Sequence, residues 1–276
     1  MKLGFWASFL AALANIGSFA FAHGDEALSE ATNKLQADPL ILWGSVAIGF
    51  LVALVISLRT SKFGNIRKTL VFGTIAFVVI SLTAQMTIST IVINAISESD
   101  GPVHWHADFE IWACNEKQML MSPESKLNNK VGTGLFHHHD DDRIHIEGPI
   151  LDLDSVGIDD FFEVIGGHLH QEELEFIDHD GELKVFQNGD LCNDQESKVQ
   201  VFLLRVTNPE DDNWTYIQTK LEHFDDYTPA PHTAIPPGDC LIIEFDVEKE
   251  KTDRLCTSYR IAEEKGALTR GESTSP

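Results

Sequence analysis

Residues 104–114, HWHADFEIWAC, alternate between polar and apolar side chains from the first histidine to the isoleucine. Successive side chains of a β-strand point to opposite faces of its sheet. The alternation therefore predicts a strand with one face toward a hydrophobic core and the other toward solvent. The apolar face carries a tryptophan, an alanine, a phenylalanine and an isoleucine. The polar face carries His104, His106, Asp108 and Glu110.

Similar runs follow along the chain, and they predict a mainly β domain over residues 97–262. The runs are RIHIEG (143–148), LKVFQNG (183–189), KVQVFLLRV (198–206), TYIQTKL (215–221), CLIIEFDV (240–247) and RLCTSYRI (254–261). IDDFFEVI (158–165) predicts one short helix, because acids occupy its first turn and two glycines follow it. We expect a sandwich or a small barrel with that one helix, and a disordered tail at 263–276.

Histidines are concentrated in this domain, which holds eleven of the twelve in the chain. His-x-His pairs occur at 104/106, 137/139 and 168/170, and a single histidine lies in the strand-like RIHIEG. Two imidazoles two residues apart on a strand share a face and can reach one ion. Neutral imidazole suits Zn and Cu, which take three or four such ligands. The predicted ligands are His104, His106, His137, His139 and His145.

Further residues are candidates for supporting roles at this site. A carboxylate can hold the second ring nitrogen of a ligating histidine, or act as a general base. Asp108, Glu110 and Glu147 are predicted for those roles. Additional ligands could come from His168 and His170, and from His23 if signal cleavage makes it the N-terminus. The alternative interpretation is a solvated polar face on several edge strands.

The four cysteines, Cys114, Cys192, Cys240 and Cys256, all lie in the same domain. An even number of cysteines in an oxidising compartment suggests two disulfides, for which three pairings exist. Cys240 and Cys256 lie on two strand-like runs joined by a charged turn, so a bridge between them would leave Cys114 with Cys192. No Cys-x-x-Cys is present, which argues against a thioredoxin-type redox site.

The chain begins with features of an export signal. Lys2 is followed by a long apolar run, and Ala20-Phe21-Ala22 has the small-x-small pattern of a cleavage site. Residues 1–22 are therefore predicted to be a signal peptide, and residues 23–38 an exported tail. An uncleaved anchor helix is the alternative.

Two uncharged apolar segments follow, at 39–58 and 69–96, and each is long enough to cross a bilayer. The loop between them, 59–68, has four basic residues and no acidic residue, which places it on the cytoplasmic side. The tail and the main domain are then extracytoplasmic, anchored in the cytoplasmic membrane by a two-helix hairpin. Lipid is one expected partner, and a neighbouring membrane protein is another.

The formal net charge is −23. Such a charge repels nucleic acid and anionic lipid, attracts cations and keeps an exported domain soluble. Nucleic acid is therefore not an expected partner. The chain also has no Gly-x-Ser-x-Gly, P-loop or Gly-x-Gly-x-x-Gly motif.

Two resemblances bear on this domain. HWHADFE resembles the first cupin motif, His-x-His-x3-Glu, which implies a metal held in a small β-barrel; the later cupin histidine is matched only by Cys240, after Pro236-Pro-Gly238. The chain is also similar, over about 101–246, to exported, membrane-tethered His-rich proteins of uncharacterised function that open with HWHADF. These share, in order, HHHDDDRIHIEG, IDDFFEVIGG, LKVFQNG and PPGDCLIIEF. This resemblance implies a coherent domain and brings no activity with it.

Three functions are compatible with these features. The first is an anchored extracytoplasmic domain that binds Zn or Cu for metal capture, delivery or sensing. The second is a cupin-like metal-dependent enzyme, which would keep one coordination position open. The third is a metal-free acidic interaction domain, in which the histidine pairs lie scattered on different faces.

Overall fold

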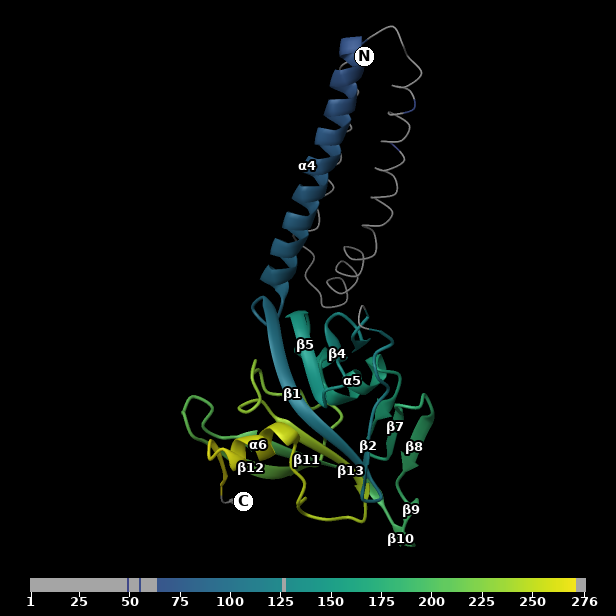
Figure 1. Cartoon of the computed structure of the whole chain (residues 1–276), viewed down its shortest axis with the longest axis vertical. Coiled ribbons are helices and arrows are strands. Elements are labelled where there is room, and N and C mark those ends of the chain that lie inside the picture. Colours follow the sequence, from purple (N-terminus) through teal and green to yellow (C-terminus); the bar gives the residue numbers. More distant parts are fainter. Residues whose placement is uncertain (1–48, 50–54, 56–63, 126–127, 272–276) are drawn as a thin grey trace. The chain divides into compact units, whose positions relative to one another are not determined.

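The computed structural model describes residues 49, 55, 64–125 and 128–271, which belong to two units, residues 1–93 and 94–276. Figure 1 labels their elements. The predicted signal peptide (1–22) and tail (23–38) lie outside the described residues. So does the first apolar segment (39–58), apart from residues 49 and 55. Each unit is described here by itself.

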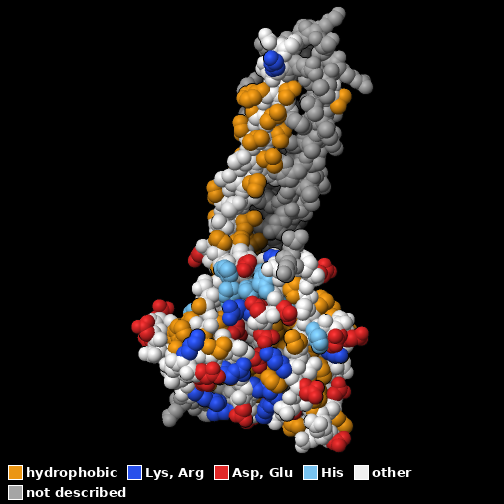
Figure 2. All heavy atoms as spheres, viewed as in Figure 1, with side chains coloured by type: hydrophobic (Ala, Val, Ile, Leu, Met, Phe, Trp, Pro, Cys, Tyr) orange, Lys and Arg blue, Asp and Glu red, His pale blue; other side chains and the backbone are white. Residues whose placement is uncertain are grey.

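The long helix α4 (Gly64–Ile96) contains the second predicted span. Its residues Val71–Ile96 form the one helix in the described ranges that is long and apolar enough to cross a membrane. Large apolar side chains such as Phe72, Ile80 and Met86 are exposed, and Figure 2 shows hydrophobic side chains along the helix. An all-round apolar helix requires an apolar surrounding, either a protein core or a bilayer. The helix begins at Gly64, so the end of the predicted loop 59–68 is helical.

Hydroxyl groups on α4 are satisfied within the helix itself. The side chains of Thr83, Thr87 and Thr90 each donate to the backbone carbonyl four residues earlier, at 2.9, 2.7 and 2.8 Å. Such bonds satisfy the polar group without a second helix. These threonines are therefore compatible with an apolar surrounding.

The main sheet of the second unit has nine strands, eight of which follow one another in a single path. That path is β14 (Leu268–Arg270), β12 (Trp214–Leu221), β11 (Lys198–Val206), β13 (Cys240–Asp246), β1 (Pro102–Ala113), β5 (Arg143–Pro149), β4 (Phe136–His138) and β3 (Val131–Gly132). The short β2 (Glu116–Gln118) also pairs with β1. The pairs β1–β13 and β12–β14 are parallel, and the others are antiparallel.

The two ends of this path are different strands, so the sheet is open and does not close into a barrel. The prediction of a mainly β domain is confirmed, and the barrel alternative is not. Two small sheets accompany the main one. They are β6 (His168–Leu169), β7 (Glu173–Ile177) and β8 (Leu183–Gln187), and the pair β9 (Leu191–Cys192) and β10 (Gln195–Glu196).

Both faces of the main sheet are covered. On β11, Val201 and Leu203 belong to one hydrophobic cluster, whereas Phe202 and Leu204 belong to another. The first cluster also contains residues of α5 (Ile158–Val164) and β7; the second contains residues of α6 (Thr257–Glu264). Strands buried on both faces are apolar almost throughout, which explains the near-continuous apolar runs in β11 and β13.

The predicted helix at 158–165 is confirmed as α5, with a 3-10 turn (Leu153–Ser155) before it. The C-terminal prediction differs from the structure. RLCTSYRI, expected to be a strand, instead leads into α6, where Tyr259 and Ala262 are buried three residues apart. A short apolar run does not distinguish strand from helix by itself. The expected disordered tail is also ordered up to residue 271: α6 reaches Glu264, and β14 pairs with β12.

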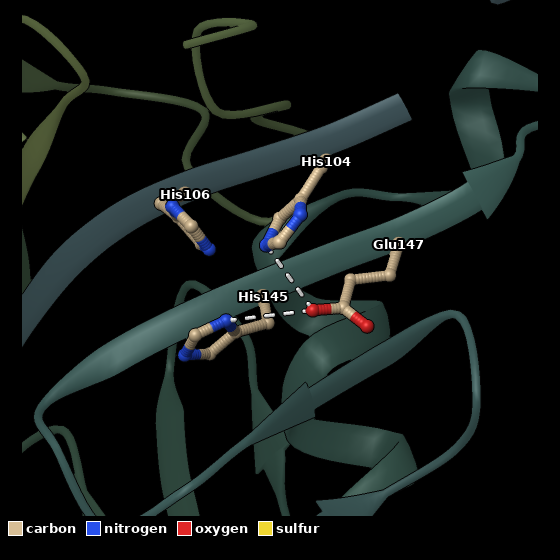
Figure 3. A group of neighbouring side chains, drawn as sticks. All are labelled: His104, His106, His145 and Glu147. Atoms are coloured by element: carbon tan, nitrogen blue, oxygen red, sulfur yellow. Dashed lines mark ion pairs between the residues drawn. The ribbon is translucent and has the colours of Figure 1, made fainter. Parts of the chain in front are cut away.

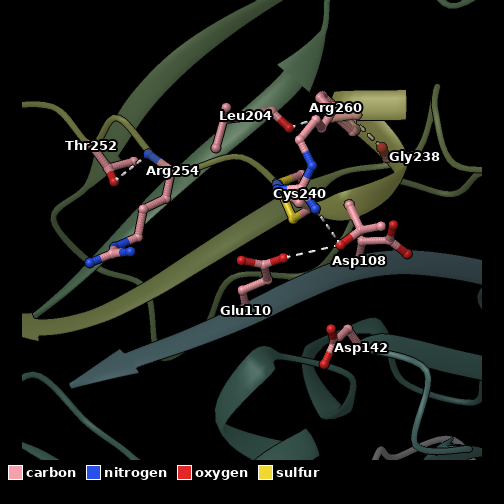
Figure 4. Close-up of a disulfide and its surroundings, with 12 residues drawn as sticks. Asp108, Glu110, Asp142, Leu204, Gly238, Cys240, Thr252, Arg254 and Arg260 are labelled. Carbon is pink, nitrogen blue, oxygen red and sulfur yellow. Dashed lines mark hydrogen bonds between the residues drawn. A yellow bond between two sulfur atoms is a disulfide. The ribbon is translucent and has the colours of Figure 1, made fainter. Parts of the chain in front are cut away.

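All four cysteines form disulfides. Cys114 pairs with Cys192, which joins the end of β1 to β9, with the Cα atoms 5.0 Å apart. Cys240 pairs with Cys256, which joins β13 to the residue before α6, with the Cα atoms 5.8 Å apart (Figure 4). Of the three possible pairings, the structure therefore has the one with the disulfide expected between the two strand-like runs. No cysteine is left as a metal ligand.

Candidate metal centre

Three neighbouring strands, β1, β5 and β4, place one histidine each on the same face of the sheet. In the strand register His106 lies opposite His145, and His137 lies opposite His145 on the other side. Directly paired residues in an antiparallel sheet have Cβ atoms about 5 Å apart, so their side chains meet. His104 and His139 extend this set by one alternation on β1 and just beyond β4. We call His104, His106, His137, His139 and His145 the histidine row; Figure 2 shows histidine side chains gathered on this unit.

The first group of donors in the row is His104, His106, His145 and Glu147, whose ligand atoms all lie within 4.8 Å of one another. Figure 3 shows the first two projecting from β1 and the other two from β5. Glu147 Oε1 lies 3.2 Å from His104 Nε2 and 4.0 Å from His145 Nδ1. Ligand atoms of a tetrahedral zinc site with bonds near 2.0 Å lie about 3.3 Å apart. The group is therefore close to the spacing that a metal ion requires.

The second group is His137, His139 and His145, again with ligand atoms within 4.8 Å of one another. The rings of His137 and His145 stack with centroids 5.4 Å apart, and the ring of His139 meets that of His145 edge-on at 4.6 Å. His137 Nε2 also lies 4.0 Å from Glu147 Oε2. His145 is the histidine common to both groups.

Backbone carbonyls orient two of the rings. His106 Nδ1 donates to the carbonyl of Thr233 at 2.6 Å, and His139 Nδ1 donates to the carbonyl of Asn129 at 2.6 Å. A ring whose Nδ1 is the donor carries its lone pair on Nε2, which is the atom left to bind a metal. The tautomers follow from these hydrogen bonds. Neither contact could be found from the sequence, because any residue supplies a carbonyl.

Asp141 orients the central ring. Its Oδ2 accepts a hydrogen bond from His145 Nε2 at 3.1 Å, which leaves the Nδ1 lone pair directed toward Glu147. Burial is the largest single influence on Asp141 and opposes its ionisation, but the hydrogen bond and charge of His145, the backbone N–H of His139 and the charge of Arg143 together outweigh it and lower the pKa of that carboxyl. Asp141 was not among the residues predicted from the sequence. Its position in the DDD run, four residues before His145, was the available signal.

His137 is the most deeply enclosed donor, with 0% of its surface exposed. Neither of its ring nitrogens has a hydrogen-bond partner among the described residues, and the same holds for His106 Nε2 and His145 Nδ1. Burial lowers the pKa of His137 to about 4 and also lowers the pKa of His106. Both rings are therefore neutral near pH 7, which is the form that binds metals.

The predicted carboxylates divide into two kinds. Glu147 is part of the first donor group. Asp108, whose pKa is raised by burial, accepts from Arg143 Nε at 2.8 Å. Glu110 accepts from Trp112 at 3.0 Å and pairs with Lys117 at 3.2 Å. The last two acids are thus engaged by cations and do not join either donor group.

The third histidine pair lies away from the row. His168 and His170 flank Leu169 at the short strand β6, and both are exposed. His23 lies outside the described residues. The side chains of a third set also have ligand atoms within 4.8 Å of one another; the set is Asp178, His179 and Asp180. Asp178, however, already accepts from the backbone of Asp180 and Glu182 and pairs with Lys184, which defines a turn.

A cavity of about 230 Å³ lies beside the row. Its polar lining includes Asp108, His138, Asp140, Asp141, Asp142 and Thr257. Asp141 belongs to both places, because it lines the cavity and accepts from His145. Asp141 therefore connects the cavity to the donor groups.

Comparison of the chain with protein-family models, curated proteins and solved structures gives no match.

Proposed function

We propose that this chain is a membrane-anchored, extracytoplasmic metal-binding protein that holds Zn or Cu(II) in the histidine row, for capture, delivery or sensing of the metal. The donors are the predicted histidines His104, His106, His137, His139 and His145, together with Glu147. Asp141 and two backbone carbonyls orient the rings.

The observation that carries the proposal is the state of His137. A buried polar group without a hydrogen bond costs about 1–3 kcal/mol, and both nitrogens of this fully buried ring lack a partner in the described part of the chain. Neighbouring rings present further unpartnered nitrogens toward the same space. A bound ion would accept the lone pair of one nitrogen from each of these rings, whereas on a solvated polar surface water would bind them.

The donor types favour Zn or Cu(II). Imidazole and carboxylate suit these ions, whereas Cu(I) prefers thiolate and thioether ligands. All cysteines are in disulfides, and the donors of the row are imidazole nitrogens and the Glu147 carboxylate.

The location rests on the sequence. The proposed anchor is a hairpin of residues 39–58 and 69–96, with the basic loop 59–68 in the cytoplasm, after export directed by residues 1–22. The two disulfides support an oxidising compartment. The helix Val71–Ile96 supports the second span by length and composition.

The test is the metal content of the full chain purified in detergent, measured by elemental analysis beside two variants. His145→Ala removes the ring common to both donor groups. His168→Ala is the matched control, because it removes an exposed histidine of the same domain. We expect Zn or Cu in the wild type and the control, and a lower metal content in His145→Ala. Absence of metal in all three, even after incubation with both ions, would leave an acidic interaction domain.

A second function, a metal-dependent enzyme, is favoured by the cavity beside the row, although the open sheet is not the barrel that the cupin resemblance implies. Ion pairs hold Asp108 and Glu110, the bases expected for such an enzyme. Asp141, which lines the cavity and contacts His145, is better placed for that role. An enzyme needs a position for water or substrate at the metal. X-ray absorption of the zinc-loaded chain separates the two functions: a coordinated water favours the enzyme, and a site filled by protein ligands favours the binding module.

A further inference from the structure

We propose that the histidine row holds two metal ions, one on each side of His145, with the Glu147 carboxylate bridging them. This inference rests on the proposed function and adds the number of ions and the ligands of each.

The first argument is the number of donors. The row and Glu147 together offer more donors than the four of a tetrahedral zinc ion. These donors form two sets, and His145 is the member they share. His106 and His139 lie on opposite sides of His145, with ring centroids 4.5 and 4.6 Å from it. Each of those outer rings is oriented by its own backbone carbonyl. A single ion bound on one side of His145 would leave the oriented ring on the other side without a metal to bind.

The second argument is the direction of the two carboxylate oxygens of Glu147. Oε1 lies 3.2 Å from His104 Nε2, in the first set, whereas Oε2 lies 4.0 Å from His137 Nε2, in the second. A carboxylate that presents one oxygen to each of two donor sets is suited to bridge two ions. Paired ions in proteins lie about 3.5–4 Å apart, a separation that one carboxylate spans.

The ligands can then be assigned. The first ion takes His104, His106, His145 Nδ1 and Glu147 Oε1, which completes four positions. The second takes His137, His139 and Glu147 Oε2, which leaves one position open to water, the arrangement that the enzyme alternative requires. His145 Nε2 remains hydrogen bonded to Asp141, so the shared ring need not bind both ions.

The experiment is a stoichiometry measurement on the full chain in detergent, loaded with Cu(II) and freed of excess metal. We expect two ions per chain in the wild type. His104→Ala/His106→Ala should retain one ion, held by the second set. His139→Ala, which spares the buried His137, should retain one ion in the first set. His168→Ala/His170→Ala is the matched control and should retain two. Circular dichroism checks that each variant is folded.

Electron paramagnetic resonance gives an independent readout. Two Cu(II) ions joined by one carboxylate couple magnetically, so the wild-type spin count should fall below its copper content. In each one-ion variant the spin count should equal the copper content. Glu147→Gln should restore the uncoupled signal if two ions remain bound.

The outcomes distinguish this inference from the proposed function. One ion in the wild type, abolished equally by variants on either side, overturns the two-ion assignment and leaves the metal-binding function intact. No bound metal in the wild type overturns both. Two ions that keep full spin count in the wild type overturn the bridge by Glu147.

Discussion

The histidine pair at 168/170 and the pair at 104/106 have the same spacing but different surroundings. His106 on β1 lies opposite His145, and His104 lies opposite Glu147. His168 on β6 lies opposite Glu175, and β6 is an edge strand of its sheet, with no strand beyond it among the described residues. Both pairs thus have a glutamate opposite their first histidine, but only the first pair also has a histidine opposite its second. A His-x-His pair becomes a candidate site only when neighbouring strands bring further histidines into register with it.

The largest effect expected from this comparison is at the centre of the row. His145→Ala should weaken binding of Zn by at least about 100-fold, because even outer-shell partners of metal ligands contribute 10–100-fold. Isothermal titration with Zn measures the change. His168→Ala should leave the affinity unchanged; an equal loss in both variants would show that local spacing, not register, makes the site.

The buried ring of His137 gives the stability of the metal-free protein a pH dependence. Its pKa is about 4 in the folded chain, below the ordinary value of 6.5. The unfolded chain therefore binds the proton first as pH falls, so apo stability is fully present above pH 6.5 and is lost between about pH 6.5 and 4. At 1.36 kcal/mol per pKa unit the loss is about 3 kcal/mol.

The measurement is the unfolding free energy of metal-free protein across that range, for wild type and His137→Gln. The variant should lack this part of the pH dependence. His170→Gln, at an exposed position, serves as control and should follow the wild type. If the unfolding free energies of the wild type and of His137→Gln changed in parallel with pH, His137 would not be the source of the pH dependence.

A substitution at Asp141 tests whether the orientation of the His145 ring contributes to Zn affinity. Asp141→Asn retains the size of the side chain but weakens the hydrogen bond from His145 Nε2, and it should lower Zn affinity by about 10–100-fold. Asp180→Asn is the control, since that carboxylate is exposed next to His179. Competition with a fluorescent zinc chelator measures both. Unchanged affinity in Asp141→Asn would indicate that the sheet alone orients His145.

The smallest expected effect comes from adding a donor to the exposed pair at 168/170. Glu175→His places an imidazole directly opposite His168, in the register that the row uses. It should create a weak additional Zn site, at least about 100-fold weaker than the row, because no buried or carboxylate-oriented ring supports it. Elemental analysis at excess Zn, comparing Glu175→His on the His145→Ala background with His145→Ala alone, measures the new site. Binding as tight as that of the row would show that burial adds little.

Much of the site could be predicted from residue types and spacing. The histidines of the row were selected because they alternate along extended segments, and the structure brings all five together with Glu147. Asp108 and Glu110 share the polar face of β1 with His104 and His106 but pair with cations instead. Their partners, Arg143 and Lys117, come from other strands, so the local pattern could not reveal them.

What the sequence by itself determined is the local part of the molecule: the strand that begins at His104 and the two histidines on its polar face, the α5 helix, and a helix at 71–96 apolar enough for a membrane. These follow from side-chain periods of two and 3.6 residues, which neighbouring residues alone establish. The tertiary structure decided the strand order β1–β5–β4, the register that aligns His106, His145 and His137, and the helix that replaces a strand after Cys256. Register depends on which apolar faces pack into a common core, because a shift of one residue would turn every side chain to the opposite face.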